Sequence, residues 1–370
     1  MSLAPGTTLA ESPTPPVRVT RSRRPLRWSI PLVAAVVIVL AALPYVVYSG
    51  TTDVLVNFFI LVTMASMWNL LAGYAGLVSV GQQAFIGLGA YIVLLLGLHA
   101  VNPFAAVPLA AIGCGVLALP ISLLVMRLRG GYFAIATWVV ADSCEQLVAR
   151  SQTLGGGTGA GVAGFAGANP TLLSANTYWV ALAVTVVALL AVYLVLRSRL
   201  GLVLTAVRDN ETGARSLGTR VTRAKRAVYL VAGAGCGAAG ALLAASQRFV
   251  QPGSVFSVQW SAEMIFVTVI GGIGTIEGPI VGAAVFFILQ QTLSQYGAWY
   301  LIILGVVAIA VAIWTPRGLW GFVSRRVHIR LFPVGYWVRA PGAGAAARHG
   351  EAEAGTGSDP GAPSAPPPDG

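Results

Sequence analysis

The sequence predicts an all-α integral membrane protein with about ten transmembrane helices, some of them broken or re-entrant at glycine-rich segments. Hydrophobic residues make up 56% of the 370-residue chain and charged residues 9%, with a mean hydropathy of +0.78, whereas soluble domains carry about 25% charged residues. Apolar stretches close to the roughly 20 residues that cross a bilayer recur along the chain. Basic residues gather between alternate stretches, as they do in cytoplasmic loops.

The first apolar stretch follows a Pro- and Arg-rich segment, residues 1–27, and is longer than the core of a signal peptide, so we expect an uncleaved anchor. Together the spans define a transmembrane domain over residues 28–315, with a large loop at 197–226. The Pro-rich, acidic end of the chain favours a largely disordered tail over 316–370. The predicted spans are 28–48, 54–72, 82–98, 104–126, 131–149, 178–196, 227–246, 260–276, 279–296 and 299–314.

Threading these spans from a cytoplasmic N-terminus places 21 of the 23 basic residues on the same side of the membrane. Only Arg150 and Arg248 fall on the other side. Because basic residues collect in cytoplasmic loops, we expect both termini and the loop 197–226 in the cytoplasm.

Several classes of binding site are not predicted. The formal charge of +11 does not indicate nucleic-acid binding, because the basic residues are not interleaved with aromatic residues on one soluble face. No serine, cysteine or histidine lies in a recognisable nucleophile arrangement, so no catalytic residues are expected. Neither a disulfide framework nor a metal site is expected from the scattered cysteines and histidines, which are Cys114, Cys144, Cys236, His99, His328 and His349.

One glycine-rich loop contains a literal G-x-G-x-x-G at Gly159, Gly161 and Gly164. A dinucleotide site needs a preceding strand and an acidic residue about twenty positions later, and this run has neither. A phosphate-binding loop needs a Gly-Lys-Ser/Thr sequence, but the only lysine is Lys225. We therefore expect no nucleotide cofactor and interpret the run as an external loop, flexible or tightly turned, which is compatible with contact to an external partner.

Two other glycine clusters interrupt predicted spans, at residues 73–90 and 271–283. Breaks at membrane depth are tolerated where neighbouring protein or a water-filled cavity satisfies the backbone, often beside a transport pathway. Glycines four apart, such as Gly274 and Gly278, equally suit close helix packing. Both readings stay open. The candidate pathway residues are Gly76, Ser79, Gln82, Gly272 and Gly274.

Acidic residues inside membrane spans are costly and therefore informative. Asp142 and Glu145 lie three apart on one helix face, Glu263 begins a later span, and Asp53 lies at an outer boundary. All four are expected near the outer surface, where pairing with Arg150 or Arg248 would stabilise them. We favour that structural pairing, with a proton relay as the alternative.

The basic loop contains a segment with the periodicity of an amphipathic helix, residues 202–217. Gly201 is its expected hinge, Gly218 its expected stop, and Glu211 can pair with Arg215 four residues on. The expected apolar face consists of Val203, Leu204, Val207, Ala214 and Leu217.

The charges of this segment suit two different partners, an anionic lipid surface or another protein. Binding to anionic lipid would suit the basic residues alone, including Lys225, but the leaflet would repel Asp209 and Glu211. The mixed charge therefore favours docking of another protein at the cytoplasmic surface.

The chain resembles the permease subunits of ABC importers for branched-chain amino acids, in the second of the two permease types that such importers use. The resemblance extends over roughly residues 54 to 322. One departure is Gln82, where many relatives carry His. The matching stretches are NLLAGYAGLVSVGQQAFIGLGAY (69–91), GGYFAIATWVVADSCEQLV (130–148), RSRLGLVLTAVRDNETGARSLGTRVTRAK (197–225), AGALLA (239–244), SAEMIFVTVIGGIGTIEGPIVGA (261–283) and WTPRGLWG (314–321).

The resemblance implies an ABC importer permease fold in the bacterial cytoplasmic (inner) membrane, working with a second permease chain. Two separate ATP-binding subunits would hydrolyse ATP, and an external binding protein would deliver substrate. The implied coupling residues are Val207, Arg208, Asp209, Asn210, Glu211, Arg215, Leu217 and Gly218.

The substrate class stays open at this point. The family resemblance implies branched-chain or other hydrophobic amino acids, while relatives also move urea or short amides. The rival hypothesis is a self-sufficient proton-coupled transporter in which Asp142, Glu145 and Glu263 titrate.

Overall fold

The computed structural model describes residues 18–20, 26–45, 49–164, 170–293, 299–315, 318–327 and 337–339. Residues Trp28–Phe332 form one unit, and the two chain ends form another. In the second unit, β1 (Arg18–Thr20) pairs antiparallel with β4 (Trp337–Arg339), with Val19 opposite Val338. The predicted tails, 1–27 and 316–370, otherwise lie largely outside the described residues.

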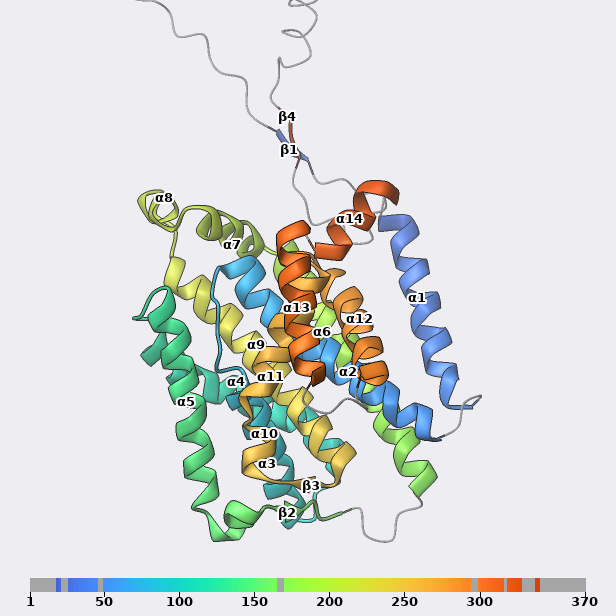
Figure 1. The fold of residues 1–370 in the computed structure, drawn as a ribbon. Coiled ribbons are helices and arrows are strands. Elements are labelled where there is room, and N and C mark those ends of the chain that lie inside the picture. The colour runs from blue at the N-terminus through green and yellow to red at the C-terminus, as the bar shows by residue number, and fades with distance from the viewer. Residues whose placement is uncertain are drawn as a thin grey trace, which may run out of the picture. The chain divides into compact units, whose positions relative to one another are not determined.

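The larger unit is almost entirely helical (Figure 1). The described residues of this unit contain one two-stranded pair, β2 (Ala160–Gly161) with β3 (Phe249–Val250). Its helices are α1 (Leu26–Ala42), α2 (Ser49–Asn69), α3 (Gln83–Leu98), α4 (Pro103–Val125), α5 (Gly131–Ala149), α6 (Pro170–Arg197), α7 (Arg199–Asp209), α8 (Glu211–Ser216), α9 (Val221–Gln247), α10 (Pro252–Val255), α11 (Val258–Gly271), α12 (Gly278–Leu293), α13 (Trp299–Trp314) and α14 (Gly318–Val327). Shorter helical turns cover Leu43–Tyr45, Leu70–Tyr74, Gln152–Leu154 and Gly156–Thr158.

Each of the ten predicted spans coincides with a helix of this unit. Within the described residues, five helices are both long and apolar enough to cross a membrane, over Gly50–Tyr74, Pro103–Val125, Leu172–Arg197, Val221–Gln247 and Pro252–Gly271. The all-α class predicted from composition is therefore confirmed, while the number of crossings stays a prediction.

Helix α9 is the centre of the bundle, because α2, α3, α4 and α6 all pack against it. Small residues permit this. A Cβ added at Gly240 would overlap the carbonyl oxygen of Ile86 on α3, and one added at Gly89 of α3 would overlap the carbonyl oxygen of Gly237. Close backbone approach of this kind drives helix association in lipid, where apolar burial offers little advantage over contact with acyl chains.

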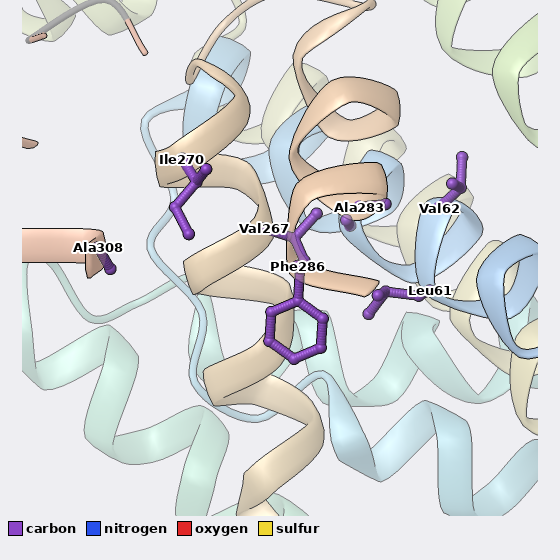
Figure 2. Close-up of a cluster of buried hydrophobic side chains, with 8 residues drawn as sticks. Leu61, Val62, Val267, Ile270, Ala283, Phe286 and Ala308 are labelled. Atoms are coloured by element: carbon purple, nitrogen blue, oxygen red, sulfur yellow. The ribbon is translucent and has the colours of Figure 1, made fainter. Parts of the chain in front are cut away.

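A second packing centre joins α2, α11, α12 and α13. Figure 2 shows Phe286 of α12 in the same cluster as Val267 of α11 and Leu61 of α2. The buried members are Leu61, Val62, Ala65, Val267, Ile270, Ala283, Phe286 and Ala308. The cluster holds the helices on either side of the second glycine-rich segment against α2.

Replacing Gly240 by valine tests the packing of α3 on α9. The new side chain must push α3 away from the Ile86 carbonyl, and overpacking of this kind costs about 1–3 kcal/mol. We expect a lower unfolding temperature in detergent, measured by the loss of the monodisperse species on heating. Gly305→Val is the matched control, because a Cβ at Gly305 meets nothing within 4 Å. Equal melting of the two variants would contradict this account of α9.

Candidate functional site

The amphipathic segment of the basic loop folds as two helices, α7 and α8, so the expectation of one continuous helix over 202–217 was wrong. Asn210 adopts an extended conformation (φ −154°, ψ 98°), and its Oδ1 accepts a hydrogen bond from the Gly213 amide at 2.8 Å. Asparagine favours such N-caps over helix interiors because its side chain competes for backbone partners. The break therefore has a local cause at Asn210.

The two predicted glycine boundaries had different outcomes. Gly201 lies within α7, where a Cβ would overlap the Leu196 backbone, so it serves close packing and is not a hinge. Helix α7 begins earlier than expected because Ser198 caps it, accepting from the Leu200 amide at 3.1 Å. Gly218, at φ +75°, follows the end of α8 as predicted.

The apolar face of these helices is mostly buried. Val207 of α7 and Ala214 of α8 pack with Val221 of α9, and Leu204 is fully buried. Leu217 is the exception, because 86% of it is exposed at the end of α8. Its position fits the apolar face, but no other part of the described chain covers it.

Glu211 forms two hydrogen-bonded ion pairs, one within α8 and one that joins α8 to α9. Its Oε1 accepts from Arg215 at 2.8 Å, as the spacing predicts, and its Oε2 accepts from Lys225 at 2.7 Å. The bond from Lys225 has the largest effect on the pKa of Glu211 and, together with the bond from Arg215, lowers it below its ordinary value despite partial burial. Lys225 thus has a partner within the protein, which periodicity could not reveal.

Arg208 joins α7 to the first glycine-rich segment. Its Nη1 donates to the carbonyl oxygen of Gly73 at 2.8 Å, across 135 residues of sequence. Its contact with Asp209 at 3.3 Å lies between exposed side chains, with 42% and 69% accessible, and contributes little. The Gly73 contact is therefore the one that fixes the guanidinium.

Asn69 joins the same place to the second glycine-rich segment. Its Nδ2 donates to the Thr275 carbonyl at 2.7 Å, and its Oδ1 accepts from the Gly274 amide at 2.8 Å. Asn69 is 1% exposed and ends α2. Gly73 lies so close to Gly274 that a Cβ at Gly73 would overlap the Gly274 backbone. We call Asn69, Gly73, Arg208, Gly274 and Thr275 the junction.

The structure brings some predicted pathway residues to the junction and separates others. A Cβ at Gly274 would lie 3.1 Å from Arg208 Nη1, and one at Gly76 3.8 Å from Arg208 Cα. Gly272 is three residues from Thr275, whose hydroxyl donates to its carbonyl at 2.9 Å. Gly76, Gly272 and Gly274 have φ values of +66°, +125° and +79°, which glycine tolerates best.

Ser79 and Gln82 lie farther along, in the irregular stretch that leads from α2 to α3, and both are fully buried. Trp68 donates from Nε1 to the Ser79 carbonyl at 2.8 Å, and Gln82 donates from Nε2 to the Ser79 hydroxyl at 3.3 Å. The Thr137 hydroxyl of α5 accepts from the Val80 amide at 3.3 Å. Side chains of α2 and α5 thus supply partners for this irregular backbone.

Sequence reasoning missed Asn69, Trp68 and Thr137. Asn69 carried a usable signal, since a strongly polar residue inside an apolar span is expected to find a partner within the protein. Trp68 and Thr137 carried none, because their hydrogen-bonding roles depend on tertiary contacts.

The expected pairing of the acidic residues was wrong within the described residues. Neither Asp142, Glu145 nor Glu263 forms an ion pair with Arg150 or Arg248 there. Glu263, 6% exposed, instead accepts a hydrogen bond from Gln259 Nε2 at 2.9 Å. One turn of α11 thus satisfies part of this carboxylate locally.

Comparison with known proteins gives a consistent result. Residues 50–312 match the family described as the permease component of the branched-chain amino acid transport system. The high-affinity branched-chain amino acid transport system permease protein LivM of Salmonella typhimurium (strain LT2) is 28% identical over 315 residues, which is 77% of this chain and 73% of the relative. LivM of Escherichia coli (strain K12) is 27% identical over the same shares. No solved structure matches significantly.

Replacing Glu211 by glutamine tests the attachment of α8. Losing the charged hydrogen bonds should cost about 1 kcal/mol, which speeds amide exchange of residues 211–217 about fivefold in mass-spectrometric measurements. Because the pKa of Glu211 is lowered in the folded state, this stabilisation is present above the ordinary carboxyl pKa and lost as the pH falls through the folded value. Asp209→Asn, at the exposed carboxylate, is the control. Exchange that is equally fast in both variants would refute the attachment.

Proposed function

Because the chain belongs to the family of permease components of branched-chain amino acid transport systems, we propose that it is the membrane subunit of an ATP-driven importer for branched-chain or other hydrophobic amino acids. ATP hydrolysis belongs to separate subunits, since the sequence contains no phosphate-binding loop. The observation that carries this proposal is the hydrogen bond from Arg208 to Gly73, which ties the charged helix α7 to the bundle.

Helices α7 and α8 suit the docking of an ATP-binding subunit. Leu217 offers an exposed apolar anchor, and charged residues of both signs surround it. Glu211 holds α8 to α9 through Lys225, so a force on α8 is passed on to the bundle. Apolar anchors bordered by polar residues are common at protein interfaces.

The junction provides the route by which docking would act on the membrane helices. A displacement of α7 pulls the Gly73 carbonyl through Arg208, and Asn69 transmits the same displacement to Gly274 and Thr275. Both irregular segments therefore respond together. Positive-φ glycines at these positions permit the backbone to change conformation with little steric cost.

The proposed solute pathway includes the irregular segments themselves. Gly76, Ser79, Gln82, Gly272 and Gly274 remain its candidate residues, because backbone groups outside regular helices and polar side chains suit a zwitterion. Apolar neighbours suit a branched side chain. Measuring how strongly valine, urea and acetamide each inhibit the uptake of labelled leucine distinguishes a transporter of amino acids from a transporter of urea or short amides.

The working assembly we propose contains this chain, a second permease chain, two ATP-binding subunits and an external substrate-binding protein. It lies in the bacterial cytoplasmic membrane with both termini of this chain in the cytoplasm, as the distribution of basic residues favours. The rival proton-coupled carrier predicts that this chain alone concentrates solute when a proton gradient is applied.

Arg208→Met tests the coupling. The substitution keeps an unbranched side chain but removes the donor to Gly73, so ATP hydrolysis by the reconstituted complex should persist within about twofold while leucine uptake falls at least about tenfold, a difference of about 1.4 kcal/mol or more in coupling. Arg199→Met is the control, an exposed arginine on the same helix. Uptake that is as rapid with Arg208→Met as with Arg199→Met excludes the proposed route.

Leu217→Asp tests the docking surface. A carboxylate in place of the apolar anchor should weaken binding of the ATP-binding subunit by about 2 kcal/mol, roughly thirtyfold, as measured by co-purification and titration. Leu128→Asp, an exposed leucine in the turn between α4 and α5, is the control. If the ATP-binding subunit binds both variants as tightly as the parent, the surface lies elsewhere.

A further inference from the structure

Three residues on one face of α3 contact the α10–α11 segment. Gln83, Gly87 and Tyr91 are four residues apart, so they lie one above the other on the helix. Gln83 Oε1 accepts a hydrogen bond from the Ser261 hydroxyl of α11. The ring of Tyr91 stacks on that of Phe256, which lies between α10 and α11, with centroids 6.1 Å apart at 26°.

The two polar ends of this face carry unpaired groups. Gln83 Nε2 and the Tyr91 hydroxyl have no hydrogen-bond partner within the described part of the chain, although the residues are 0% and 4% exposed. Buried polar groups in folded proteins are almost always paired, since leaving one unpaired destabilises the fold. Two such groups lie on the same helix face, where one ligand could partner them during the protein's working cycle.

Phe256 separates these two groups. Gln83 and Tyr91 are eight residues apart, about 12 Å along α3, and Gly87 lies between them. A Cβ at Gly87 would overlap the phenyl ring of Phe256, so the ring occupies space that any other residue would fill. The ring is 2% exposed and is therefore enclosed by the surrounding helices.

Other residues of α3 pack closely against α9. Gly89 packs on the backbone of Gly237, and Phe85 packs edge-on against Tyr229 at 5.6 Å, both on α9. The face with Gln83, Gly87 and Tyr91 instead contacts Ser261 of α11 and Phe256 in the turn between α10 and α11. At the Tyr91 end, the Glu145 carboxylate of α5 would lie 3.9 Å from a Cβ at Gly253 of α10.

We propose that the α3 face of Gln83, Gly87 and Tyr91 is a solute passage, with the Phe256 ring as a removable plug between two polar binding positions. The inference rests on the proposed function and specifies its solute-binding residues. The Gln83 amide donates to the carboxylate of an amino acid, the Tyr91 hydroxyl hydrogen-bonds it at the other position, and Phe256 contacts its apolar side chain. Gln83 is thus a recognition residue in addition to the pathway candidates named above, which include its neighbour Gln82.

Chemical labelling tests the plug without any assumption about the solute. Ser261→Cys is prepared alone, with Phe256→Ala, and with Phe286→Ala, a buried phenylalanine in the separate cluster of Figure 2. A cationic methanethiosulfonate reagent is applied to the complex in nanodiscs, and modification of residue 261 is followed by mass spectrometry of its peptide. We expect at least tenfold faster modification with Phe256→Ala than with Ser261→Cys alone, and no acceleration with Phe286→Ala. Equal rates in the two double variants overturn the plug.

Uptake measurements test the recognition residues. Gln83→Glu keeps the acceptor for Ser261 but replaces the unpaired donor by a negative oxygen, and Tyr91→Phe removes only the hydroxyl. Each should raise the KM for labelled leucine about tenfold while ATP hydrolysis and assembly are retained. Tyr178→Phe, a buried tyrosine whose hydroxyl donates to Leu40 at 2.6 Å, is the control. If the parent complex imports leucine and both variants match it, the passage is wrong. If the parent complex does not import leucine, the proposed function is wrong and the labelling rates still decide the passage.

Discussion

Backbone groups that leave a helix inside a membrane protein must be satisfied by the protein itself, because the hydrocarbon offers no hydrogen bonds. This constraint determines the arrangement around the two glycine-rich segments. Asn69 bonds both Gly274 and Thr275, Trp68 bonds Ser79, and Thr137 bonds Val80. Each partner comes from a helix remote from the segment in sequence or lies at the end of the helix before it. Irregular backbone inside this largely apolar bundle therefore requires polar side chains that serve as its hydrogen-bond partners.

The same constraint gives α7 its connection to the bundle. The Gly73 carbonyl is freed where α2 ends, and Arg208 satisfies it from a helix 135 residues later. A long cationic side chain can reach such a carbonyl while its charged end stays partly hydrated, as 42% exposure indicates. Because Asn69 lies one turn earlier and bonds the second segment, three parts of the chain meet at one place without a large apolar interface between them.

Much of the fold could be predicted from sequence because the relevant signals are local. The lengths of the apolar stretches predicted ten spans, and each of them coincides with a helix. The i, i+4 spacing predicted the ion pair of Glu211 and Arg215. The two helices α7 and α8 could not be separated by periodicity, since the apolar pattern continues through Asn210 and only its capping conformation interrupts it. Asn69, Lys225 and Gln83 escaped detection because their partners are far away in sequence. Leu217 shows the opposite limit: its position fits the apolar face, yet the end of α8 leaves it uncovered.

The close backbone approach of α3 to α9 has a consequence for mechanics. Where Gly89 meets Gly237 and Gly240 meets Ile86, the two backbones lie so close that no side chain fits between them and could change rotamer to accommodate sliding. We therefore expect α3 and α9 to move as one rigid body. We therefore expect relative movement on the side of α3 that meets α10 and α11, where a four-residue helix, a turn and an aromatic ring can be displaced without breaking the α3–α9 contact.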